Sequence, residues 1–120
     1  MRRVLGFAAI AVVLASTVAA ATLPGKRIAI ARGSGPFAIA VAHGQVNTPK
    51  ALYAKLSGKV GDATVLVDCL VGAEATPITY RRPRAALFRF PVRPAGADIC
   101  HVTATVSGRG KIVAELRAVR

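Results

Sequence analysis

The sequence predicts a small all-β fold: an antiparallel β-sandwich of seven or eight strands with one disulfide, preceded by a signal peptide. Three observations favour this class. Short segments alternate between apolar and polar side chains and are closed by Gly, Pro, Asn or Asp. No stretch after residue 21 has a convincing helical period. The chain of 120 residues is long enough for one domain, and its two cysteines follow an N-terminal export signal.

Residues 1–21 have the parts of a secretory signal peptide. Arg2 and Arg3 supply the positive start, an apolar run covers 4–14, and alanines at 19–21 suit cleavage. Removing both arginines leaves 15 of 17 basic residues against five acidic ones, a formal charge of +10. The predicted location is secreted, periplasmic or in the cell envelope, without stable membrane insertion after cleavage. An uncleaved signal anchor that tethers the domain is the alternative. The excess of arginine (12) over lysine (5), with abundant alanine, indicates a bacterial source.

The elements follow in order along residues 22–120, which we expect to form one domain. Turn-forming residues separate the candidate strands, as in GSGP at 33–36, GQVNTP at 44–49 and RPAGAD at 93–98. The candidates cover 26–32, 37–43, 51–57, 63–71, 76–81, 86–92, 99–107 and 111–119.

The last two candidate strands are expected to form a hairpin, because GRG at 108–110 supplies glycines for a tight turn. Their expected inward side chains are Cys100, Val102, Ala104, Val106, Ile112, Ala114, Leu116 and Ala118. Segment 63–71 is apolar at nearly every position. It therefore predicts a central strand covered on both faces, in which Asp68 needs a polar partner if it is buried.

Cys69 and Cys100 are predicted to form a disulfide. Two cysteines in a small exported chain usually pair, and both lie on the apolar face of their strand. The thiols would meet in the core, between neighbouring strands or across facing sheets. Free thiols are one alternative, and a Cys₂His₂ metal site with His43 and His101 is another. Adjacent residues on a strand point to opposite faces, so Cys100 and His101 cannot easily converge on one ion. No metal and no cofactor is predicted.

The late cysteine, followed by alternating valines and a final hairpin, resembles the architecture of immunoglobulin-type domains. The chain departs from that pattern in three ways. It has no tryptophan, Asp98 stands where a tyrosine corner has Tyr, and the two cysteines are only 31 residues apart. The resemblance implies an immunoglobulin-like architecture and no function.

The sequence offers little for catalysis. Its five acidic residues are scattered singly, and His43 and His101 are the side chains that titrate near neutral pH. Ser34 lies in RGSGP, which suits a turn and lacks the setting of a nucleophile elbow. We expect a non-catalytic protein without catalytic residues. A small secreted hydrolase is the second alternative.

The functional signal is the basic segment YRRPRAALFRFPVR at 80–93. Guanidinium groups grip carboxylate or phosphate oxygens in pairs, although a charge run is also common on an ordinary solvated surface. In the expected strand, Arg89 and Arg93 point to one outer surface near the preceding arginine loop. The predicted anionic-ligand site consists of Arg81, Arg82, Arg84, Arg89 and Arg93.

The predicted function is therefore that of an exported, non-catalytic protein that binds an anionic envelope or extracellular ligand. The expected partner is a polyanion (an envelope polymer, an acidic polysaccharide or nucleic acid) or an acidic protein. A protein-interaction or inhibitor module that meets a secreted partner through a loop or an edge strand is the alternative. The oligomeric state is left open.

Overall fold

The structure, a computed structural model, describes residues 23–120. Within this range all regular structure is β, and six strands join in one antiparallel sheet, as the sequence predicts for the class. The strands are β1 (Lys26–Gly33), β2 (Ala38–Asn47), β3 (Ala51–Val71), β4 (Glu74–Arg82), β5 (Leu87–Phe90) and β6 (Ile99–Val119). The predicted signal peptide lies outside the described residues.

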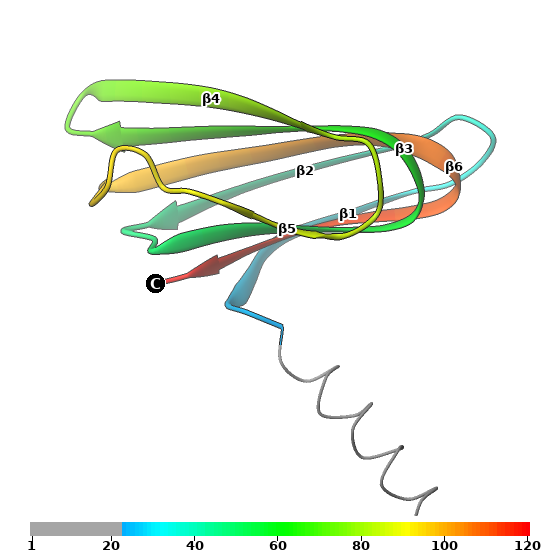
Figure 1. The fold of residues 1–120 in the computed structure, drawn as a ribbon, viewed down its shortest axis with the longest axis horizontal. Coiled ribbons are helices and arrows are strands. Elements are labelled where there is room, and N and C mark those ends of the chain that lie inside the picture. Colours follow the sequence, from blue (N-terminus) through cyan, green and yellow to red (C-terminus); the bar gives the residue numbers. More distant parts are fainter. Residues whose placement is uncertain (1–22) are drawn as a thin grey trace, which may run out of the picture.

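Two long strands, β3 and β6, organise the sheet. Each has 21 residues, they pair with each other along almost their whole length, and both double back at one end of the molecule (Figure 1). The other strands pair with the halves of this bent pair. The half formed by β2, residues 99–108 of β6, residues 62–71 of β3, and β4 is called the β2–β4 layer. The half formed by β1, residues 112–118 of β6, residues 51–57 of β3, and β5 is called the β1–β5 layer. The two layers pack face to face in a sandwich-like arrangement.

Glycines allow the sheet to bend. At Gly58, which has a φ of +93°, a Cβ atom would lie 2.2 Å from the carbonyl oxygen of Lys111. On the opposite strand, a Cβ at Gly108 would lie 2.2 Å from the carbonyl oxygen of Lys59. Register shifts between Ser57 and Lys59 and between Val60 and Asp62 add the local twist of β-bulges. Only glycine fits at these two positions, because the two backbones approach so closely there.

The expected final hairpin is wrong. Segments 99–107 and 111–119 do not pair with each other, because they are the two halves of β6, and each pairs with its own half of β3. Segments 51–57 and 63–71 are likewise halves of one strand. A glycine pair suits a tight turn and a sharp bend equally well. The partner strand β3 bends at the same level and pairs with β6 on both sides of the glycines, so β6 bends there and does not form a turn.

The alternation predicted within the two halves of β6 is confirmed, since all eight expected inward residues are buried. The five largest fully buried side chains all belong to the β1–β5 layer, namely Phe90, Leu52, Leu56, Ile112 and Leu116, and the β2–β4 layer contributes the smaller Val65, Val102 and Val106. Small residues on β2 let the layers approach. A Cβ at Gly44 would lie 3.0 Å from the side chain of Ile28 on β1.

Segment 63–71 is central in its layer but is not covered on both faces, contrary to expectation. Val65 and Val67 are buried, whereas Leu66 is 37% exposed and Val71 is 44% exposed. An apolar run therefore does not distinguish a covered strand from one with an open outer face. Asp68 lies on this outer face, and its Oδ1 atom is buried without a hydrogen-bond partner among the described residues.

Candidate functional site

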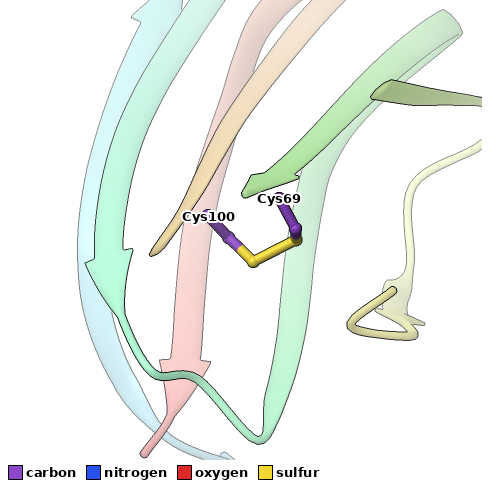
Figure 2. Close-up of a disulfide and its surroundings, with 2 residues drawn as sticks. All are labelled: Cys69 and Cys100. Atoms are coloured by element: carbon purple, nitrogen blue, oxygen red, sulfur yellow. A yellow bond between two sulfur atoms is a disulfide. The ribbon is translucent and has the colours of Figure 1, made fainter. Parts of the chain in front are cut away.

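The two cysteines form the predicted disulfide (Figure 2). They lie directly opposite each other in the register of β3 and β6, with a Cα–Cα distance of 4.1 Å, and both are 0% exposed. This spacing is near that of a non-hydrogen-bonded pair of antiparallel strands. The bridge therefore joins neighbouring strands within the β2–β4 layer and does not link the two layers. Of the arrangements considered from the sequence, the structure has the one between neighbouring strands.

His101 follows Cys100 but points to the opposite face, as strand geometry requires. On the outer face of the β2–β4 layer its ring makes an interplanar angle of 21° with that of His43, with the centroids 6.1 Å apart. The Nδ1 atom of His43 is 2.7 Å from the hydroxyl of Thr103. Within residues 23–120, no three His, Cys, Asp or Glu side chains are grouped so that they could hold a metal ion.

The structure separates the arginines of the first part of the basic segment. Arg81 points outward from β4 and forms an ion pair with Asp62 at 3.1 Å. Arg82 pairs with buried Ala63, so its side chain lies on the inner side of this edge strand. Its guanidinium carbon is 5.2–5.7 Å from the ring centroids of three aromatic residues, namely Tyr80, Phe88 and Phe90. Arg82 is therefore a packing residue that covers the open edge between the two layers.

The remaining three predicted arginines are exposed. Arg84 lies in the connection before β5, with its guanidinium carbon 5.6 Å from the ring centroid of Phe88. Arg93 lies in the connection after β5. Arg89 belongs to β5 and points outward, because its pairing partner is Tyr53 while the buried Phe90 pairs with the buried Leu52.

Arg89 is part of a cationic surface that the local sequence pattern does not predict. One row of the β1–β5 layer runs across four strands as Arg27, Arg117, Tyr53 and Arg89. Neighbouring rows add Lys55 and Arg32. We call these six residues the basic face. Neighbouring strands lie ~4.8 Å apart, so the four-residue row extends for about 14 Å.

One acidic residue, Glu115, also points outward among these rows, and it is paired with Arg117. The guanidinium of Arg117 also donates to the carbonyl oxygens of Pro24, at 2.9 Å, and Gly25, at 2.7 Å. Its side chain is only 16% exposed. Arg117 therefore holds the segment before β1 against the sheet, and the exposed cations of the face are Arg27, Arg32 and Arg89.

The opposite outer face has a different character. The outward residues of β2 include no Lys, Arg, Asp or Glu, and Ile39 is 62% exposed and Val41 is 54% exposed. The outward positions of the other strands in this layer include Arg81 together with Asp62 and Asp68. Of the two outer faces of the bent sheet, the positive charge is therefore concentrated on the β1–β5 side. Strand alternation would have placed Arg117 and Lys55 on outer faces, but only the pairing of strands places them beside Arg89.

No protein-family model matches the sequence, and no curated protein is similar to it. Among solved structures, the chain is similar to TmCBM61 in complex with beta-1,4-galactotriose, with 11% identity and a TM-score of 0.45. The match covers 73% of this chain and 67% of that chain. In the described range no helix is long and apolar enough to cross a membrane.

Proposed function

We propose that the protein is an exported, non-catalytic β-protein that binds an anionic extracellular polymer through its basic face. The observation that supports this most is the row of Arg27, Arg117, Tyr53 and Arg89 on one open sheet surface. Four strand segments that are distant in the sequence bring these side chains together. A linear polymer with repeated negative groups matches such a row, because it meets several cations at once.

The charges of the face also favour an anionic partner on energetic grounds. Arg27 and Arg117 are directly opposite in the register of β1 and β6, and Glu115 balances the charge of Arg117 but not that of Arg27. Within residues 23–120, the two ion pairs use Arg81 and Arg117 and leave Arg27, Arg32 and Arg89 without an acidic partner. An anion bound across the face would accept hydrogen bonds in pairs from the exposed guanidinium groups of Arg27, Arg32 and Arg89.

Of the five arginines assigned to the ligand site, the proposal keeps Arg89 on the basic face and Arg84 and Arg93 as exposed cations flanking β5. Arg81 and Arg82 have the other partners described above. Export agrees with the disulfide, because such bridges are typical of oxidising compartments. A sandwich of immunoglobulin-like architecture is proposed as the scaffold.

The test compares two double variants that remove the same charge from different places. Arg32→Ala/Arg89→Ala changes the basic face, and Lys59→Ala/Arg109→Ala changes two exposed cations at the bend. Binding to a sulfated polysaccharide is measured by calorimetry at low salt and at about 0.15 M salt. We expect the face variant to weaken binding about tenfold, equivalent to ~1.4 kcal/mol, and the bend variant to change it little.

Equal losses in the two variants would mean that only net charge matters and would reject the basic face as a site. Absence of binding by the unchanged protein would reject the proposal altogether. Both variants should keep the melting temperature of the parent, since all four side chains are exposed and outside the core.

A further inference from the structure

A cleft lies beside the basic face, at the open end of the sandwich where the edges of β1 and β2 meet the end of β6. It has a volume of about 860 Å³, within the ~300–1,000 Å³ range of small-molecule sites. Its walls come from both layers. Residues 25–28 and 118–120 contribute from the β1–β5 side, and residues 45–48 contribute from β2 and the turn after it.

The lining combines positive charge with neutral hydrogen-bonding groups. Lys26, Arg27 and Arg120 are the cations, while the Gln45 and Asn47 amides and the Thr48 hydroxyl both donate and accept. No acidic and no aromatic side chain is among the described residues that line the cleft. A site of this composition favours a ligand that is anionic and rich in hydroxyl groups. It has no ring on which a neutral sugar would stack.

Backbone geometry fixes the wall on the β1 side. Lys26 pairs with Ala118, whose side chain is buried, so Lys26 lies on the inner side of the strand and faces the cleft. The neighbouring Arg27 has the opposite orientation and belongs to the row of the basic face. At Gly25 a Cβ atom would lie 2.4 Å from the carbonyl oxygen of Ala118, so only glycine allows the segment to pass this close.

The same segment joins the cleft to the basic face. Arg117, in the middle of the row, donates to the carbonyl oxygen of Gly25, which lines the cleft. The row ends at Arg27 on β1, the edge strand of its layer, and Arg27 also lines the cleft. An acidic chain that crosses the row from Arg89 to Arg27 therefore reaches the cleft when it passes the edge of the sheet.

We propose that this cleft binds the terminal sugars of a carboxylated oligosaccharide. This deepens the proposed function, on which it rests, by naming the ligand class and a separate subsite for the chain end. Lys26 binds a carboxylate within the cleft, Arg27 binds one at its rim, where the row of the basic face ends, and Gln45, Asn47 and Thr48 bind the sugar hydroxyls. A short acidic oligomer fills the cleft, whereas a long one also covers the basic face.

The experiment is calorimetric titration of the full chain with a linear trimer of galacturonic acid, and with a neutral glucose trimer and tripolyphosphate for comparison. The acidic trimer should bind, and the neutral trimer should not. Lys26→Ala should weaken binding of the acidic trimer about tenfold, since it removes a charged hydrogen-bond donor. Lys59→Ala, which removes the same charge at the bend, should leave it unchanged.

Two further variants separate recognition from simple charge. Asn47→Ala should weaken binding of the acidic trimer several-fold at constant charge, while Thr105→Ala, an exposed change on the outer face of the β2–β4 layer, should not. Binding of tripolyphosphate as tightly as the acidic trimer, or equal effects of Lys26→Ala and Lys59→Ala, would overturn the inference. Either result would show that the protein recognises only the negative charge of the ligand.

The outcomes for the cleft and for the basic face are distinguishable. If the polymer binds through Arg32 and Arg89 but the acidic trimer does not bind, the cleft proposal fails and the proposed function stands. If the trimer binds in the cleft but the polymer is insensitive to the loss of Arg32 and Arg89, the basic face fails as a polymer site. Melting temperatures of the variants show whether any loss is due to unfolding.

Discussion

Loss of the Cys69–Cys100 disulfide should remove a large part of the stability of this domain. The bridge connects residues separated by 31 positions, and the loop that it closes contains β4 and β5. Chain-entropy arguments give about 3–4 kcal/mol for a loop of this length at 25 °C. A domain of this size has a total unfolding free energy of ~5–15 kcal/mol. Reduction should therefore remove roughly one fifth to four fifths of the stability of the domain.

The disulfide contributes to stability in two ways, through its cross-link and through the core space that its sulfur atoms fill. Both cysteines are fully buried, so Cys69→Ala/Cys100→Ala removes the cross-link and also leaves unfilled space in the core. Protein that is reduced in denaturant and refolded keeps both sulfur atoms and loses the cross-link alone. We expect reduction to cost about 3–4 kcal/mol and the double alanine variant to cost more.

Guanidinium chloride unfolding, followed by circular dichroism, measures the unfolding free energy of the oxidised protein, the reduced protein and the double alanine variant. Reduction should lower the midpoint and increase the slope of the transition, because the uncrosslinked chain exposes more surface on unfolding. The melting temperature should fall by roughly 15 °C, since about 1 kcal/mol corresponds to several degrees in a domain of this size. A loss below about 1 kcal/mol with an unchanged slope would refute the view that the bridge acts through the unfolded chain.

Three further predictions concern single residues. Gly58→Ala should destabilise the fold by more than ~2 kcal/mol in thermal unfolding, because the added Cβ would meet a carbonyl oxygen of β6. Gly35 also has a positive φ, but a Cβ added there would have no atom within 4 Å, so Gly35→Ala should cost only ~1 kcal/mol. Similar losses would contradict the close approach of the backbones. Arg82→Ala should cost about 1–2 kcal/mol through its lost contacts with three aromatic rings, whereas Arg81→Ala should cost at most ~1 kcal/mol, because its ion pair is exposed. Equal values in urea unfolding would count against the packing role. Asp68→Thr should keep or raise the melting temperature, since it removes a buried oxygen without a partner, and a clear decrease would indicate an unrecognised interaction.

Local patterns predicted much of the fold. The alternation in 99–107 and 111–119 placed all eight inward residues correctly, because a strand places successive side chains on opposite faces whatever its neighbours are. The same rule placed the side chains of His101 and Cys100 on opposite faces of their strand and indicated that both thiols face the core. Two cysteines after an expected export signal then made the disulfide the favoured outcome.

Pairing between distant segments was not predictable from the same patterns. GRG at 108–110 has the composition of a hairpin turn, yet β6 continues through it, because β3 bends at the same level and supplies partners on both sides. An apolar run at 63–71 likewise could not show that its outer face is open. These features depend on which strands become neighbours, and a local period does not contain that information.

The candidate site likewise combines features that follow from local patterns with features that depend on strand pairing. The sequence by itself determined the fold class, the high positive charge and the side of each strand that faces the core, since composition and the period of two act locally. Only the tertiary structure decided which cations are neighbours. It separated Arg81 and Arg82 to opposite sides of β4 and placed Arg89 in a row with Arg27 and Arg117, residues that are far away in the sequence. The physical reason is that a ligand surface is assembled across strands, by the register of the sheet, whereas the sequence runs along them.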